Sequence, residues 1–202
     1  MRRIAPLLGL AIVLAGCGSS AAKIEVAPRP TSAFKGGTVT PPVEAPPISL
    51  HTADGTPVTL AAQKGKYALV TFLYVHCPDV CPLITANLNT ALRELGPDAK
   101  KVRVLAVSVD PKGDTPAAVK AYAKEKHLLP QFEYLIGTRA ELRQAWAAWH
   151  VLSVADKKGL VTHVAYTTLV DPTGKERVLY GSNVHATDVL HDLRVLMRKP
   201  AA

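Results

Sequence analysis

The stretch YALVTFLYVHCPDVCP, residues 67–82, decides the fold of this chain. Its first part, 67–75, is almost entirely apolar, which is typical of a strand buried on both faces of a sheet. Cys77 and Cys81 follow, and apolar residues at helical spacing continue to Leu95. The stretch therefore predicts a strand, a tight turn and a helix, with two free thiols exposed at one edge of a sheet.

Two chemistries suit a pair of thiols at this position. The N-terminus of the predicted helix favours the thiolate form of Cys77 and Cys81 through its unpaired N–H groups and its dipole. Thiolates serve either in disulfide exchange or as ligands of a soft metal such as Cu(I). Peroxidase chemistry in this kind of fold needs Ser or Thr three residues before the reactive cysteine, where this chain has Tyr74 and Pro78. The sequence therefore leaves a redox pair and a metal site open.

The rest of the chain alternates strand-like and helix-like segments. Strands are expected at 48–50, 58–60, 102–109, 132–136, 164–170 and 177–180; helices are expected at 82–95, 115–126, 138–149 and along the apolar stripe from Val189 to Met197. Turn signals at Asp54-Gly55 and at 171–174 predict two hairpins. Thr115 before Pro116 is an N-cap signal, and Thr138 with Glu141 three residues later predicts a capping box. This order predicts an α/β domain, a thioredoxin-like mixed sheet flanked by helices, with an N-terminal β-hairpin.

The N-terminus has the layout of a secretory signal. Arg2 and Arg3 precede an apolar stretch from Ile4 to Leu14, which is too short to span a membrane. The Leu-Ala-Gly sequence before Cys17 looks like a bacterial lipobox, in which Cys17 is lipidated and becomes the mature N-terminus. Residues 1–16 are therefore predicted to be a lipoprotein signal peptide, and the protein is expected to be an extracytoplasmic bacterial membrane lipoprotein.

Composition separates a tether from a folded domain. Residues 17–47 are rich in Ala, Pro, Gly, Ser and Thr, which predicts a flexible, lipid-anchored tether. Residues 48–199 have the length of one domain with a sizeable core. The formal net charge is +8, but the charges are scattered and the chain is predicted to be exported, so nucleic acid is not an expected partner. The lipid anchor makes a membrane the expected neighbour.

A third ligand to a two-sulfur metal site is commonly an imidazole. Among the seven histidines, His163 stands out because it is expected to start the strand that ends at Asp171. In a thioredoxin fold the beginning of that strand lies alongside the cysteine turn. The same region, 151–170, lacks the proline that thioredoxins keep there to orient a substrate disulfide. Of the remaining histidines, His76 is expected to point to the opposite face from the adjacent Cys77. The others are expected to be surface residues, namely His51, His127, His150, His185 and His191.

These features together resemble the Sco/SenC family. The resemblance rests on 71–82, on 107–111 with 114–116, and on His163 standing eight residues before the turn at 171–174. It implies a membrane-tethered, thioredoxin-like copper protein that helps assemble the binuclear copper centre of cytochrome c oxidase subunit II. The family usually has Asp directly before the histidine; here that residue is Thr162, which could weaken support for the imidazole without removing a ligand.

The resemblance implies that Cys77, Cys81 and His163 bind copper, as Cu(I), Cu(II) or both. The expected function is delivery of copper to cytochrome c oxidase subunit II or to another copper protein. The alternative is a thiol-disulfide reductase, with Cys77 and Cys81 as the redox pair, that keeps the cysteines of the oxidase copper site reduced. Whether the protein is an enzyme stays open, and either function requires an upstream thiol reductant, because a disulfide excludes copper.

Overall fold

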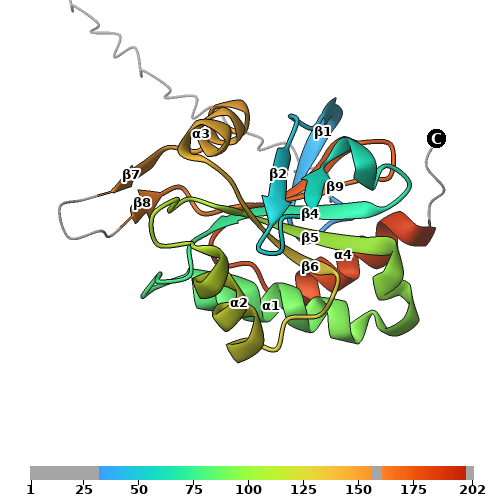
Figure 1. Ribbon diagram of the computed structural model, residues 1–202. Helices are drawn as coiled ribbons and strands as arrows, with labels where there is room; N and C mark the ends of the chain where they lie inside the picture. Colours follow the sequence, from blue (N-terminus) through green and yellow to red (C-terminus); the bar gives the residue numbers. More distant parts are fainter. Residues whose placement is uncertain (1–31, 156–160, 199–202) are drawn as a thin grey trace, which may run out of the picture. The chain divides into compact units, whose positions relative to one another are not determined.

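The apolar run of residues 67–75 contains β4 (Tyr67–Leu73), an inner strand of an eight-stranded sheet (Figure 1). β4 pairs in parallel with β5 (Val102–Ser108) and antiparallel with β9 (Thr167–Val170). All of its residues after Tyr67 are buried. The prediction of a strand covered on both faces is confirmed, and this strand leads directly into the two cysteines.

The sheet is mixed, and its strand order is β1-β10-β9-β4-β5-β6-β2-β3. The computed structural model describes residues 32–155 and 161–198, without the side chains of 154–163. The other strands of this sheet are β1 (Gly37–Glu44), β2 (Ser49–Thr52), β3 (Pro57–Thr59), β6 (Phe132–Ile136) and β10 (Lys175–Tyr180). β2 and β3 form the predicted N-terminal hairpin. A separate antiparallel pair consists of β7 (Ser153–Ala155) and β8 (Val161–His163).

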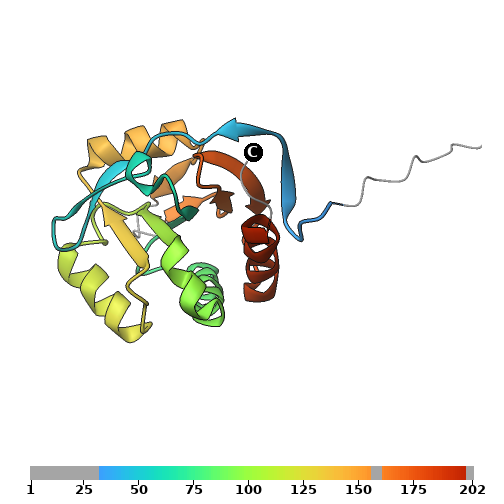
Figure 2. The ribbon, with the colours of Figure 1, turned by 90° about the vertical axis from the view of Figure 1, so that its right-hand side faces the viewer.

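Helices cover both faces of the sheet, as predicted. They are α1 (Cys81–Glu94), α2 (Pro116–Glu125), α3 (Arg139–Ala148) and α4 (Ala186–Arg198), with the short 3-10 helices η1 (Ala61–Gln63) and η2 (Gly96–Lys101). Figures 1 and 2 show α1, α2 and α4 on one face and α3 on the other. In the described ranges, no helix combines the length and the apolar character needed to cross a membrane.

Helix starts follow the capping signals in the sequence. The Thr115 hydroxyl accepts a hydrogen bond from the Ala118 N–H (3.2 Å), and Pro116 is the first residue of α2. At α3, the Thr138 hydroxyl and the Glu141 carboxylate form the expected capping box. These local contacts satisfy N–H groups that have no partner inside the helix. They explain why both helices begin where the sequence predicted.

The predicted boundary between tether and domain is wrong. Residues 37–44 form β1, which pairs with the edge strand β10, and the folded unit extends back to Ser32. The prediction failed because the exposed, proline-containing sequence of β1 has no apolar alternation, so its partner is visible only in the folded chain. The predicted signal peptide, Cys17 and the first part of the predicted tether, 17–31, lie outside the described residues.

Candidate metal and dithiol site

The two cysteines lie in the turn between β4 and α1. The backbone N–H of Cys77 donates to the Tyr74 carbonyl (3.3 Å), which closes the chain back on itself after β4. Cys81 is the first residue of α1, and Pro82 occupies the first turn, where a missing N–H is tolerated. The predicted tight turn is confirmed, and the helix begins one residue earlier than expected, at Cys81.

Both thiols face the protein core. The exposed fraction is 9% for Cys77 and 0% for Cys81, and neither is in a disulfide. Pro78 and Asp79 are exposed, so the turn presents its middle to solvent and directs its two cysteines inward. The prediction that the thiols are exposed at the sheet edge is therefore wrong. The sequence indicates that the two cysteines lie between a strand and a helix. The direction in which their sulfurs point depends on how the turn folds over the core.

Burial also reverses the predicted acidity of one thiol. Burial raises the pKa of the Cys81 thiol, and a hydrogen bond with the Cys77 thiol adds to the shift. A hydrogen bond with the backbone of Tyr74 opposes it only in part. The N-terminus of α1 favours the thiolate, but removal from water dominates at Cys81. The reduced site is thus a sheltered pair of thiols in which burial keeps Cys81 protonated, and the two sulfurs lie close enough to interact.

A buried carboxylate lies under the same end of the sheet. Asp114, with an exposed fraction of 3%, accepts hydrogen bonds from the Val75 N–H (2.9 Å), the Ser108 hydroxyl (2.6 Å) and the Tyr134 hydroxyl (3.0 Å). Burial raises the pKa of Asp114 to about 6, although all three hydrogen bonds oppose the shift. Its charge in turn contributes to raising the pKa of the Cys81 thiol.

Asp114 was not singled out for a role by the sequence argument. Asp114 belongs to the segment 114–116, which is one of the segments that carry the family resemblance. The signal that points to it is an acidic residue directly before the helix cap Thr115, in the loop that follows β5. Because loops after neighbouring parallel strands meet at one sheet edge, this loop has to approach the cysteine turn.

The structure places the backbone of His163 differently from the prediction. His163 closes β8 and pairs with Ser153 of β7, so it does not begin the strand that ends at Asp171. That strand, β9, starts only at Thr167, so the predicted strand over 164–170 is too long. The side chain of His163 lies outside the described residues, and its role as a ligand stays a prediction.

The hairpin that carries His163 nevertheless lies at the cysteine end of the sheet. The Ser153 hydroxyl donates to the Val109 carbonyl (2.9 Å), and the Val109 N–H donates to the Leu73 carbonyl (2.9 Å). These contacts tie β7 to the ends of β5 and β4, just before the cysteine turn. Figure 1 shows β7 and β8 at the end of the molecule where β4 leads into α1.

The described side chains supply two metal ligands and not three. No group of three or more His, Cys, Asp or Glu side chains in metal-binding proximity occurs among them. Five of the other histidines were expected at the surface; His51 is half-buried, and the other four, His127, His150, His185 and His191, are exposed. His76 is exposed as well. Two thiols suit Cu(I), so the cysteine pair alone fits that ion.

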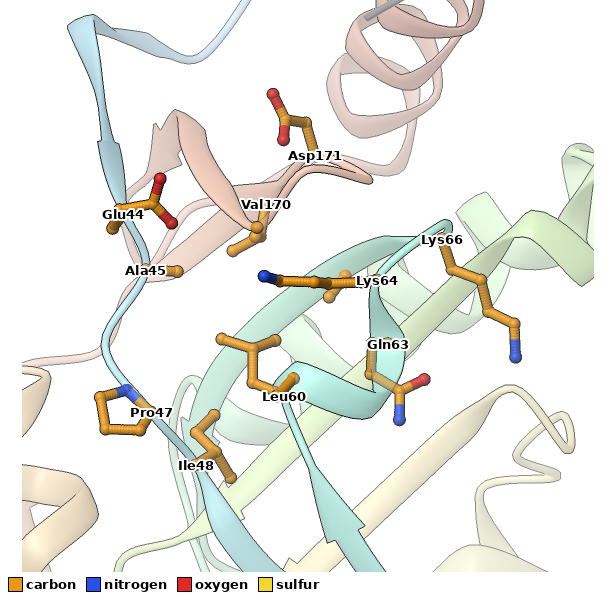
Figure 3. A pocket seen from close by; sticks show the side chains of 13 residues that line it. Glu44, Ala45, Pro47, Ile48, Leu60, Gln63, Lys64, Lys66, Val170 and Asp171 are labelled. Atoms are coloured by element: carbon orange, nitrogen blue, oxygen red, sulfur yellow. The ribbon is translucent and has the colours of Figure 1, made fainter.

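One cavity in the described part of the chain lies away from the cysteines. A cavity of about 230 Å³ opens at the end of the sheet where β4 begins, whereas the cysteines follow the end of that strand. Figure 3 shows Lys64 extending across it from η1 toward Glu44 of β1, with Ile48 and Leu60 below. No cysteine lines this cavity. This cavity is therefore not part of the cysteine site.

Comparison with known proteins agrees with this geometry. The SCO1/SenC family model matches residues 39–198. The mitochondrial protein SCO2 of Saccharomyces cerevisiae is 31% identical over 155 residues, which is 73% of this chain but 51% of the yeast protein, so the chain spans about half of that relative.

Two solved structures share the fold. The copper-bound structure of ScoI from Bradyrhizobium japonicum is 33% identical with a TM-score of 0.67, covering 76% of this chain and 99% of that one. BsSco, a member of the Sco family of cytochrome c oxidase assembly proteins in which a disulfide switch was identified, is 25% identical with a TM-score of 0.65, covering 78% and 96%. With the matching family model, these results establish that the chain belongs to the SCO1/SenC family.

Proposed function

We propose that this protein is a lipid-anchored copper-binding protein of a bacterial membrane that delivers copper to the binuclear copper centre of cytochrome c oxidase subunit II. The observation that carries the proposal is the pair of free, buried and mutually interacting thiols of Cys77 and Cys81 at the β4–α1 turn. Support comes from relatives: ScoI of Bradyrhizobium japonicum binds copper, and BsSco belongs to a family of oxidase assembly proteins.

The donor set fits copper better than a harder metal. Two soft sulfur ligands suit Cu(I), and an imidazole in addition accommodates Cu(II). Cys77 and Cys81 would hold the ion, and we assign the third position to His163, whose backbone lies on the hairpin at the same sheet edge. When bound, copper is the cargo that the partner protein receives by ligand exchange.

The residues of this chain prepare the site in two ways. The turn keeps both thiols together and away from solvent, so that few side-chain degrees of freedom remain to be fixed on binding. Each thiol has to lose its proton when it becomes a ligand, and burial disfavours a bare thiolate at Cys81. The negative charge of Asp114 favours a bound cation over an empty, ionised dithiol.

A thiol-disulfide reductase acting on the oxidase cysteines is the second candidate. The thiols of Cys77 and Cys81 interact directly, so they are close enough for a disulfide to need little rearrangement. BsSco, in which a disulfide switch was identified, provides a related example. As a reductase, the dithiol of Cys77 and Cys81 would give two electrons and two protons to a disulfide of the oxidase and become a disulfide itself. An external thiol reductant would then supply two electrons and restore the dithiol.

Oxidase activity in cells that lack the protein separates the two functions. Copper delivery predicts a defect when copper is scarce and recovery when copper is added. A reductase predicts recovery with an added thiol reductant and little effect of copper. His163→Ala provides the matched variant, because the histidine serves only the metal whereas the cysteines serve both chemistries. A defect that reductant alone repairs, with His163→Ala fully active, would overturn the copper proposal.

A further inference from the structure

A buried carboxylate on the last helix holds the beginning of the described chain. Asp192 of α4 has an exposed fraction of 0%. Its oxygens accept hydrogen bonds from the backbone N–H groups of Lys35 (2.8 Å) and Gly36 (3.0 Å). The Tyr180 hydroxyl donates to it as well (2.9 Å), and the His191 ring nitrogen Nδ1 lies 2.8 Å away. The carboxylate is thus fully satisfied, with half of its donors supplied by the N-terminal segment.

The segment fits too closely against the sheet for this contact to be incidental. A Cβ atom on Gly36 would lie 2.7 Å from Cε1 of the Tyr180 ring and closer still to Val178, so only glycine allows this approach. Phe34 packs against the hydrophobic core. The Ser32 hydroxyl accepts from the Phe34 N–H (3.0 Å) and also bonds to the Thr38 hydroxyl.

Beyond Gly36 the chain continues as β1. Gly37 pairs with Leu179 and Glu44 with Lys175, and the Ala45 N–H donates to the Gly174 carbonyl (2.9 Å). We call residues 32–45 the strap. It covers the edge strand β10, which would otherwise present unpaired backbone groups to other chains. Through Asp192, the strap is hydrogen-bonded to helix α4 in addition to its pairing with the sheet.

We propose that Asp192 is an anchor that docks the strap and thereby sets how far the dithiol site reaches from the membrane. This inference rests on the proposed lipid anchor at Cys17. Composition predicts a flexible chain over 17–47, which would have a root-mean-square reach of roughly 30 Å. A flexible chain as long as 17–31, the part that the strap does not include, would have a root-mean-square reach of roughly 20 Å. A shorter tether confines the site to a thinner layer and raises its effective concentration toward a membrane-embedded partner.

Two substitutions test the anchor from opposite sides. In Asp192→Asn, an NH₂ group replaces one carboxylate oxygen and faces groups that donate hydrogen bonds. The Tyr180 hydroxyl can rotate to accept from this NH₂ group, but the backbone N–H of Lys35 or Gly36 cannot accept. The substitution therefore removes a hydrogen bond between α4 and the strap. Gly36→Ala instead introduces the clash on the strap and leaves α4 intact. The matched controls are Asp188→Asn, which removes the same charge from α4, and Gly37→Ala, whose Cβ would find room 3.4 Å from the Leu179 carbonyl oxygen.

Amide hydrogen exchange of the full-length, reduced protein is the first measurement. Exchange at Lys35 and Gly36 should be at least about tenfold faster in Asp192→Asn and in Gly36→Ala than in the natural protein. The controls should keep the natural rates. Unchanged exchange at residues 35 and 36 in both test variants would overturn the proposal that Asp192 docks the strap. Gly36→Ala keeps the test valid if Asp192→Asn fails to fold.

Neutron reflectometry of the lipidated chain on a supported bilayer is the second measurement. Release of 32–36, with β1 still paired to β10, should increase the root-mean-square reach of the tether by about 1.2-fold, and loss of the β1 pairing as well would increase it by about 1.4-fold. If the distance between domain and bilayer stayed unchanged although amide exchange at Lys35 and Gly36 became faster, the proposal that Asp192 sets the reach of the dithiol site would be overturned. Absence of any protein layer would instead contradict the lipid anchor, and the exchange experiment would still decide whether Asp192 docks the strap.

Discussion

The carboxylate of Asp114 accepts a hydrogen bond from the backbone N–H of Val75, at a distance of 2.9 Å. This contact joins the loop after β5 to the beginning of the cysteine turn. The Ser108 and Tyr134 hydroxyls bond to the same side chain. The segment after β4, the end of β5 and the middle of β6 therefore all contact one buried group. The position of Cys77 therefore depends on a residue that is distant from it in the sequence.

The pH dependence of stability should reveal the buried carboxyl of Asp114. Burial raises its pKa to about 6 from a usual value near 3.8, so the folded state favours the protonated form. The resulting stability is fully present below about pH 4 and is lost as the pH rises to about 6. Relative to Asp114→Asn, which does not titrate, the unfolding free energy should fall by on the order of 2–3 kcal/mol across this window.

Denaturant unfolding of the reduced protein and of Asp114→Asn, at several pH values from 4 to 7, measures this difference. Other carboxyl groups titrate in both proteins and cancel. Asp114→Asn can keep a partner at each contact, because its amide oxygen accepts from the Val75 N–H and its NH₂ group can donate to the Ser108 and Tyr134 hydroxyls once these rotate to accept. A stability difference that is independent of pH would show that Asp114 is ionised throughout.

Asn89 of α1 should be far more important for stability than its neighbour Arg93, although both donate to the His127 carbonyl. Asn89 is buried, and its side-chain oxygen also accepts from the Leu129 N–H (3.0 Å). Asn89→Ala leaves buried backbone groups unpaired and should lower the unfolding free energy by about 2–3 kcal/mol. Arg93→Ala, at an exposed position, should change it by less than about 0.5 kcal/mol. Equal effects in thermal unfolding would refute the argument from burial.

Much of the fold could be predicted because its signals are local. The strand at 132–136 and the capping box of Thr138 and Glu141 were read from neighbouring residues, and the structure confirms both. The strap was missed because its partner, Asp192, is 156 residues from Gly36 and no local pattern announces the contact. A composition that predicts flexibility describes the free chain and not a segment held by tertiary hydrogen bonds.

The site was predictable in its location and not in its environment. The cysteine spacing placed the pair at a strand-to-helix turn, as found. The burial of Cys81, and the rise in its pKa that burial causes, depend on packing that the sequence does not encode locally. His163 was assigned to the wrong strand, because the break at 164–166 before β9 carries no proline or glycine to mark it.

Lipidation of Cys17 should determine where the protein is found. Cys17→Ser removes the predicted acceptor of the lipid and should move the protein from the membrane to a soluble fraction, without changing copper binding by the folded domain. Membrane fractionation with copper titration of both forms tests this. A Cys17→Ser protein that stays in the membrane would identify residues 1–14 as an uncleaved anchor instead.

His163→Ala should separate the two oxidation states of copper. Two thiolates still hold Cu(I), whereas Cu(II) loses the nitrogen ligand that it prefers, so Cu(II) affinity should fall by at least about tenfold. His185→Ala, at an exposed position, is the matched control. Competition titrations with a Cu(I) and a Cu(II) chelator measure both affinities. If His163→Ala kept full affinity for Cu(II), His163 would not be a ligand and the site would consist of the two sulfurs alone.

Copper stoichiometry of the reduced, purified protein tests the central claim most directly. The measurement is copper per protein after dialysis, for the natural chain, for Cys77→Ser, for Cys81→Ser and for the double variant. The proposed site predicts one tightly bound copper ion in the natural protein, weakened binding in each single variant and none in the double variant. One tightly bound ion that persists without Cys77 and Cys81 would contradict the claim that this dithiol is the copper site.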